Sequence, residues 1–221
     1  MSKRYIYFFD EVQEVIDLTG GDRDKLLELL GGKGGNLGLL CQMGIPVPTG
    51  FTITTEACND YYKQSPPDFP PGLWDDVVKS IHRIESETGK GFGSEEKPLL
   101  VSCRSGAKIS MPGMMDTVLN IGLNDKTVQA MIRLTKNPRF VWDSYRRLMQ
   151  GYGAIVMKIP DEVFEDALKE FKAKKGRKAD NECTAEEWQE LTTIYKEIIL
   201  RETKQEFPQD PYEQIRYATF A

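Results

Sequence analysis

The chain has 221 residues, the length of one or two domains, and 40% of them are hydrophobic and 29% charged, as in a globular protein. Its 29 basic and 34 acidic side chains give a net charge of −5, which argues against nucleic-acid or anionic membrane partners. The single histidine, His82, excludes mechanisms that need two histidines. Four cysteines without a C-x-x-C pair argue against a zinc site, and no signal peptide or membrane span is evident. We expect a soluble, cytoplasmic chain that holds no metal by itself.

The first half of the chain alternates between strand and helix patterns. β-Branched and aromatic runs predict strands at residues 5–9 and 51–54, and an apolar run predicts a buried strand at 99–103. Helices are predicted at residues 22–30, where Gly31 and Gly32 follow, at 36–43 and at 73–86. Thr55 is the predicted N-cap of a further helix. The proline-rich residues 65–72 predict a surface loop.

The later chain has a different pattern, with charged residues concentrated between 161 and 206. Apolar residues recur at helical spacing within 140–156, 163–171 and 188–199, and the charges then form the solvated faces of these helices. The fold class is therefore α/β (α+β): an α/β subdomain at 1–122, a helical subdomain at 123–207, and at 208–221 a helix returning to the first subdomain. That helix begins at Pro211 and stops with an open apolar face, so we expect a truncated chain.

Two segments carry residue types suited to phosphate chemistry. In residues 30–38, Lys33 is set among glycines just before a predicted helix, where its ammonium and backbone N–H groups can meet a phosphate. Gly34 follows Lys33, so the segment is neither a P-loop nor a dinucleotide fingerprint. A helix cap followed by a glycine-rich turn remains open as the alternative.

The second segment, residues 101–120, begins with an arginine at the end of a predicted strand. The guanidinium of Arg104 suits phosphate oxygens bidentately, and Lys108 is a second cation. Methionines surround Pro112 and Gly113, which favours a mobile flap that closes over a ligand. A surface loop with its methionines on the sheet is the alternative.

These motifs resemble a known family. Residues 31–37, 43–51 and 54–58 closely resemble the start of pyruvate, phosphate dikinase, as do residues 104–120. The similarity continues through residues 137–147 and 207–211, so it spans nearly the whole chain. The run from Ser110 to Thr117 distinguishes the dikinase from its sister enzyme, phosphoenolpyruvate synthase, which remains the alternative enzyme.

The resemblance implies an incomplete ATP-grasp-like subdomain with an all-helical insertion. The family is a Mg²⁺-dependent phosphotransferase that converts ATP, phosphate and pyruvate to AMP, pyrophosphate and phosphoenolpyruvate through a phosphohistidine on a later domain. That domain, the nucleotide and phosphate are the implied partners. Lys33 and Arg104 match catalytic phosphate-binding residues. The implied nucleotide-binding residues are Lys33, Arg104, Gly106, Lys108, Ser110, Gly113, Met114, Asp116 and Thr117. At Lys108 we expect arginine in the family.

The resemblance also places the phosphorylated histidine and the magnesium carboxylates beyond residue 221. His82 lies in a predicted helical stripe and is interpreted as a structural or surface residue. We therefore expect this chain alone to be inactive. A stand-alone, non-catalytic nucleotide-binding module is the remaining alternative.

Overall fold

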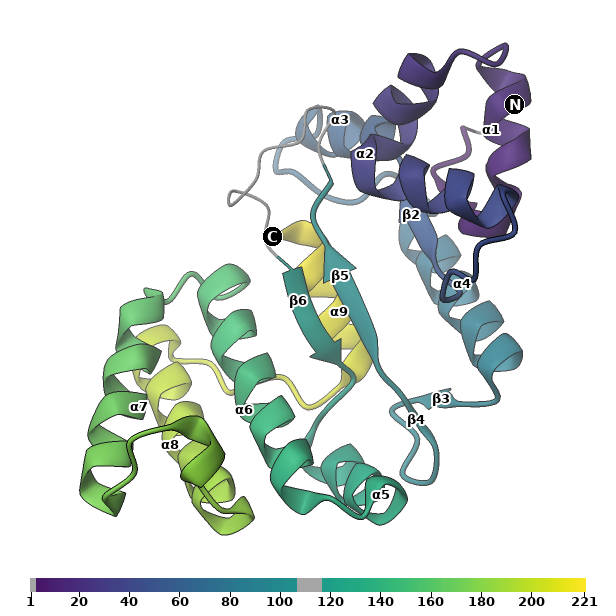
Figure 1. Cartoon of the computed structure of the whole chain (residues 1–221). Coiled ribbons are helices and arrows are strands. Elements are labelled where there is room, and N and C mark those ends of the chain that lie inside the picture. The colour runs from purple at the N-terminus through teal and green to yellow at the C-terminus, as the bar shows by residue number, and fades with distance from the viewer. Residues whose placement is uncertain (1–2, 107–116) are drawn as a thin grey trace. The chain divides into compact units, whose positions relative to one another are not determined.

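The structure is a computed structural model that describes residues 3–106 and 117–221 (Figure 1). Its residues divide into two compact units. Among the described residues, the N-terminal unit comprises 3–88 and 105–106, and the C-terminal unit comprises 89–104 and 117–221. The units do not follow the domain ranges expected from composition, which stay a prediction. Each unit is described by itself.

The N-terminal unit surrounds a two-stranded antiparallel sheet. Its elements are β1 (Ile6–Phe8), the 3-10 helix η1 (Phe9–Glu11), α1 (Val12–Leu18), α2 (Arg23–Gln42), β2 (Phe51–Ile53), α3 (Thr55–Tyr62) and α4 (Leu73–Thr88). Ile6 pairs with Ile53 and Phe8 with Phe51. The strands predicted at 5–9 and 51–54 are thus confirmed, as are the helix predicted at 73–86 and the loop at 65–72.

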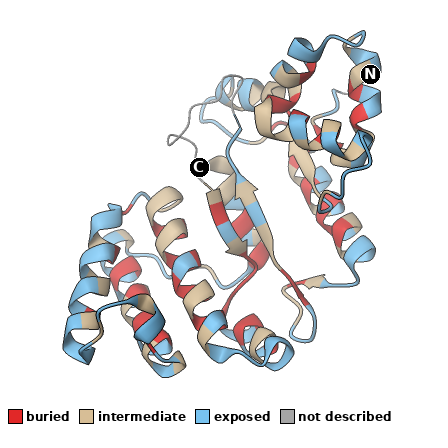
Figure 2. Cartoon of the chain, in the orientation of Figure 1, coloured by how far each residue is buried: buried red, intermediate tan, exposed pale blue. Residues whose placement is uncertain are grey.

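Apolar clusters lie on both faces of this small sheet. Successive strand residues point to opposite faces, so Tyr7 joins a cluster with α1 and α2, whereas Ile6 joins one with α3 and α4. All of β1 is therefore buried (Figure 2). The sheet is short, and its stability comes from the helices that cover it.

Helix α2 is bent at a glycine. Asp22 caps its start by accepting hydrogen bonds from the backbone N–H groups of Asp24 and Lys25. Gly31 interrupts the helix with φ 70° and ψ 159°, a conformation that only glycine adopts readily. The predicted interruption is confirmed, but the prediction that the second helix begins at residue 36 is wrong, because residues 32–35 are already helical.

The start of α3 also differs from the prediction. Thr54, not Thr55, occupies the N-cap position, and its side chain makes no capping hydrogen bond. The Thr55 hydroxyl instead donates to the Glu28 carbonyl at 2.8 Å. This hydrogen bond therefore attaches the start of α3 to the first half of α2.

The C-terminal unit combines short strand pairs with helices. Its elements are β3 (Gly91–Phe92), β4 (Pro98–Leu99), β5 (Val101–Arg104), β6 (Thr117–Ile121), α5 (Asp125–Thr135), α6 (Pro138–Ile155), α7 (Asp161–Lys175), the 3-10 helix η2 (Asp180–Glu182), α8 (Ala185–Thr203) and α9 (Pro211–Phe220). Strands β3 and β4 are parallel, and β5 and β6 form an antiparallel pair. The predicted helical character from residue 125 onward is confirmed.

The predicted buried strand at 99–103 is corrected. The run is divided between β4 and β5, and β5 is half-buried on one face and exposed on the other. Figure 1 shows α9 along one face of the β5–β6 pair, where the Cys103 thiol lies 3.5 Å from the Ala218 carbonyl. Ser102 and Arg104 alternate with Cys103 and are exposed on the opposite face.

The three predicted helical stripes form the core of this unit. They correspond to α6, α7 and α8, which carry most of the largest fully buried side chains: Trp188, Tyr145, Tyr152, Tyr195 and Phe164. The Tyr195 and Phe164 rings lie 5.0 Å apart, and the Tyr195 hydroxyl donates to the Phe164 carbonyl. Aromatic packing therefore holds α7 and α8 together.

Helix α9 begins with Pro211 in its first turn, as predicted. Its Gln214 is fully buried, where the amide donates to the carbonyls of Leu123 and Pro208 and accepts from the Gly122 N–H at 2.9 Å. Every polar atom of this side chain is satisfied, so Gln214 fixes α9 to the turn after β6. None of the helices within the described residues is long and apolar enough to cross a membrane.

Candidate functional site

Lys33 lies in the first turn of α2 after the interruption at Gly31. The side chain is half-buried, and its ammonium donates to the main-chain carbonyl of Ser105 at 3.0 Å. Within residues 3–106 and 117–221, no carboxylate lies within ion-pair distance of this ammonium. Lys25, on the same helix, instead pairs with Asp22 at 3.7 Å. Lys33 thus presents a positive charge that no described side chain neutralises.

Close packing explains three of the glycines that follow Lys33 in α2. A Cβ added at Gly34 would lie 2.2 Å from the Thr52 Oγ1 atom, and one at Gly35 would lie 2.7 Å from Leu27. At Gly38 the nearest atom would be in Val12, at 2.8 Å. Because these glycines have no side chains, the second half of α2 packs closely against β2, α1 and the first half of α2. The alternative of a glycine-rich turn is therefore wrong for residues 32–35, and the packing fixes the backbone that carries Lys33.

Arg104 is the last residue of β5, which confirms its predicted position at the end of a strand. It pairs with Thr117 in the β5–β6 register, and its side chain is exposed. Its guanidinium makes no ion pair or hydrogen bond within the described residues. Gly106, two residues further on, is also exposed, and Thr117 is half-buried. Arg104 and Thr117 lie in the C-terminal unit, and Lys33 and Gly106 in the N-terminal unit.

The other predicted nucleotide-binding residues lie outside the described residues. They are Lys108, Ser110, Gly113, Met114 and Asp116. Their roles, and the flap predicted over residues 106–117, therefore stay predictions.

His82 is an exposed residue of α4, as predicted. Its Nδ1 atom lies 2.8 Å from Glu85 Oε2 on the next turn of the same helix. Within the described part of the chain, no three His, Cys, Asp or Glu side chains gather as they do around a metal ion. Of the three cations that the sequence analysis singled out, the described residues include Lys33 and Arg104.

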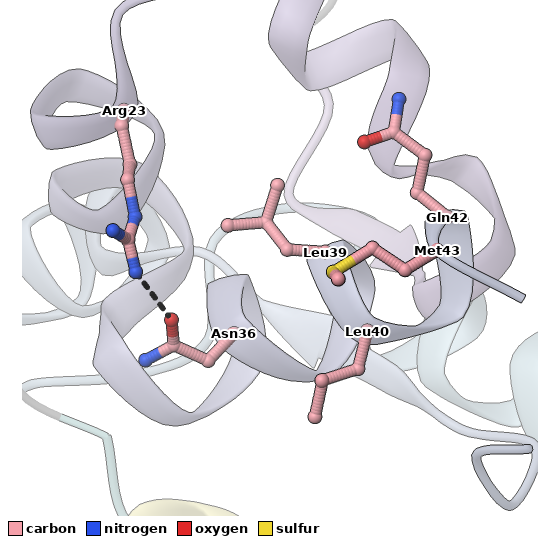
Figure 3. A pocket seen from close by; sticks show the side chains of 6 residues that line it. All are labelled: Arg23, Asn36, Leu39, Leu40, Gln42 and Met43. Carbon is pink, nitrogen blue, oxygen red and sulfur yellow. Dashed lines mark hydrogen bonds between the residues drawn. The ribbon is translucent and has the colours of Figure 1, made fainter. Parts of the chain in front are cut away.

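A hollow of about 540 Å³ lies on the N-terminal unit between the two halves of α2 (Figure 3). Its lining comprises Arg23, Asn36, Leu39, Leu40, Gln42 and Met43. The Arg23 guanidinium points to the Asn36 side chain and donates to it at 3.4 Å. The rest of the lining is largely apolar, and sequence patterns did not single it out. Neither Lys33 nor Arg104 lines this hollow.

Sequence comparisons with known proteins match part of the chain to a class of domain. A family profile described as "Pyruvate phosphate dikinase, AMP/ATP-binding domain" matches residues 27–66, which include Lys33 and the packed glycines. This match assigns the segment to the dikinase type of nucleotide-binding domain.

Curated relatives extend the match over almost the whole chain. A pyruvate, phosphate dikinase of Entamoeba histolytica is 48% identical over 210 residues, 95% of this chain and 24% of that protein. Those of Giardia intestinalis and Rhizobium meliloti are 44% and 47% identical over 99% and 96% of this chain. By sequence, the chain is similar to the N-terminal regions of pyruvate, phosphate dikinases. It spans about a quarter of the length of these relatives.

Proposed function

We propose that this chain forms the ATP- and phosphate-binding part of a pyruvate, phosphate dikinase, with an ATP-grasp-like arrangement. The observation that carries the proposal is the Lys33 ammonium, which lies within the family match and has no carboxylate partner among the described residues. A positive charge left uncompensated on a rigid backbone is suited to an anionic ligand. The relatives' names supply the class of that ligand, a nucleotide with its phosphates.

The proposed roles follow from the two side chains. Lys33 is a compact point charge and Arg104 a planar fork, and both donate to phosphoryl oxygens. Placed around a phosphoryl group that is being transferred, they offset the charge that develops on its oxygens. In the proposed reaction, ATP, phosphate and pyruvate give AMP, pyrophosphate and phosphoenolpyruvate. A histidine on another domain of the longer protein accepts the phosphoryl group, and that domain is the proposed partner of this site.

Magnesium belongs to the proposed substrate rather than to the described residues. Mg²⁺ takes oxygen ligands, usually one or two carboxylates with phosphates and water. Within the described residues no three His, Cys, Asp or Glu side chains gather, and the cations Lys33 and Arg104 fit the phosphate oxygens instead. Mg²⁺ bound to ATP would neutralise part of the triphosphate charge. Lys33 and Arg104 would orient the remaining oxygens.

The test is phosphorylation of the acceptor histidine by ATP in the longer protein. Removing one charged partner of a transferring group costs on the order of 10²–10³ in rate, which we expect for Lys33→Ala. Arg104→Lys keeps the charge but loses the planar fork, so we expect it to be similarly slow. Lys25→Ala is the matched control and should retain the native rate, because Lys25 already pairs with Asp22. Near-native phosphorylation by Lys33→Ala or Arg104→Lys would contradict the assignment.

The 221-residue chain itself provides a second test. Its single histidine, His82, is bonded to Glu85 on an exposed face of α4, so we propose that it is not the phosphoryl acceptor. A purified sample given ATP, phosphate, pyruvate and Mg²⁺ should then form no AMP above background. Steady AMP formation that disappears in His82→Gln would refute this role for His82.

A further inference from the structure

The Lys33–Ser105 hydrogen bond joins segments that are 72 residues apart in the chain. One end of it is rigid, because Gly34, Gly35 and Gly38 hold the helix of Lys33 against its neighbours. The other end is a main-chain carbonyl beside Gly106. Gly106 is exposed, and a Cβ there would meet no atom of the described residues within 4 Å. The contact is therefore made by a charged side chain on a fixed backbone and by a backbone group at the surface.

We propose that Ser105 is a positioning residue for Lys33. Its main-chain carbonyl accepts one of the three ammonium N–H groups and so directs the other two toward a phosphate. This inference rests on the proposed function, because it concerns how the same lysine meets its ligand.

The chemistry of the acceptor supports this role. An ammonium has three donors and no acceptor, so one bond to a carbonyl leaves two donors for a ligand. A carboxylate at the same place would orient the lysine but would also neutralise it. A neutral carbonyl orients the side chain and leaves its full positive charge available.

The flexibility of the lysine side chain explains why the hydrogen bond to Ser105 would favour phosphate binding. The four-carbon stem carries about 2 kcal/mol of rotamer entropy, part of which is lost when a ligand fixes the ammonium. The bond to Ser105 restrains the stem before a phosphate arrives, so less freedom is lost on binding. Ser105 contributes through its backbone, and the effect depends on the carbonyl rather than on the hydroxyl.

The proposal can be tested on the 221-residue chain by NMR, with inorganic tripolyphosphate as the probe. Three samples are compared: the native chain, Lys33→Met, and Lys25→Met as the matched control on the same helix. We expect Lys33→Met to shift the Ser105 carbonyl carbon and the Gly106 amide, because a hydrogen bond to that peptide group is lost. Lys25→Met should leave both signals in place. Tripolyphosphate should leave the Ser105 carbonyl shift of the native chain at its hydrogen-bonded value.

A second measurement weakens the carbonyl and keeps the lysine. Replacing Gly106 by glycolic acid converts the Ser105–Gly106 amide into an ester, whose carbonyl is a poorer acceptor. We expect tripolyphosphate affinity to fall about fivefold, because the ester carbonyl is a weaker acceptor for the charged ammonium. The same replacement at the exposed Gly72 should leave it unchanged, since that glycine also has open space around it.

The outcomes separate this inference from the proposed function. If Lys33→Met binds tripolyphosphate as the native chain does, the phosphate role of Lys33 fails. If Lys33→Met loses binding but does not shift the Ser105 signal, the phosphate role stands and the positioning role is overturned. Native affinity in the ester variant also overturns it. A Ser105 signal that moves to its unbonded value when tripolyphosphate binds shows that phosphate replaces the carbonyl, which contradicts a shared ammonium.

Discussion

The substitution Gly34→Ala tests whether packing of α2 on β2 fixes the backbone of Lys33. The added methyl group would lie 2.2 Å from Thr52 Oγ1, 2.7 Å from its Cγ2 and 3.0 Å from its Cβ. These contacts involve the branch point of Thr52 as well as its tip, so turning the side chain does not clear them. Either α2 or β2 must move.

The expected loss of stability follows from two opposing effects. Forcing one extra carbon into a packed interior costs about 1–3 kcal/mol, and the close contacts with Thr52 favour the upper half of that range. Alanine is better than glycine in a helix by about 1 kcal/mol, which offsets part of the loss. We therefore expect a net destabilisation of about 1–2 kcal/mol, or roughly a five- to thirtyfold change in the unfolding equilibrium.

The assay is urea unfolding of the 221-residue chain, with Gly32→Ala as the matched control. A Cβ at Gly32 would meet no described atom within 4 Å, so this variant should be as stable as the native chain or more stable. Adding Thr52→Ala to Gly34→Ala removes both clashing tip atoms and should recover part of the loss, which a double-mutant cycle measures. If Gly34→Ala is as stable as Gly32→Ala, the packing explanation of these glycines is refuted.

Three further predictions concern single residues. Gly31→Ala places a side chain at φ 70° and ψ 159° and should cost about 1–3 kcal/mol in urea unfolding; native stability would contradict the bend in α2. Burial raises the pKa of Asp180, but the hydrogen bond from Lys172 and nearby arginines outweigh it, and the pKa lies below its ordinary 3.8. The stability that this carboxylate supplies is present above that value and lost as pH falls below it, so Asp180→Asn should destabilise the chain more at pH 6 than at pH 3; an equal loss at both would refute the ion pair. Burial raises the pKa of the Cys103 thiol to about 11, so at pH 8 iodoacetamide should label the exposed Cys58 first, whereas equal rates would contradict that burial.

The long helices of the C-terminal unit were predictable because their apolar residues recur with helical spacing. Helices α6, α7 and α8 bury one face and expose charges on the other, and the spacing of apolar and charged residues in the sequence predicts this division. Helix α9 was signalled by Pro211 in its first turn.

Elements fixed by distant contacts were not predictable in the same way. Glycine disfavours helix, so the sequence predicts a turn at residues 32–35, but Thr52 and Leu27 pack closely against Gly34 and Gly35 in a helix. Strand β6 was missed because Thr117 and its neighbours were interpreted as part of a motif, and its pairing partner β5 determines its conformation. The half-exposure of β5 depends on which face α9 covers, and a short apolar run does not encode that.

The candidate site likewise combines features that the sequence predicts with features that depend on distant contacts. The location of Arg104 at a strand end followed from the apolar run before it. Lys33 was expected just before a helix, whereas it lies in the first helical turn after the bend at Gly31. The Ser105 carbonyl that holds Lys33 was missed, because every residue carries a carbonyl and the contact spans 72 positions. The close approach of Thr52 to Gly34 likewise cannot be predicted from the spacing of neighbouring residues in the sequence.

The proposed function requires that Lys33 and Arg104 hold the phosphates of a nucleotide. A crystal structure of the longer protein with a non-hydrolysable ATP analogue measures this directly. We expect the Lys33 Nζ atom and the Arg104 guanidinium each to lie about 3 Å from phosphate oxygens, at hydrogen-bond distance. An ordered triphosphate held by other residues, with both side chains turned to solvent, would contradict it.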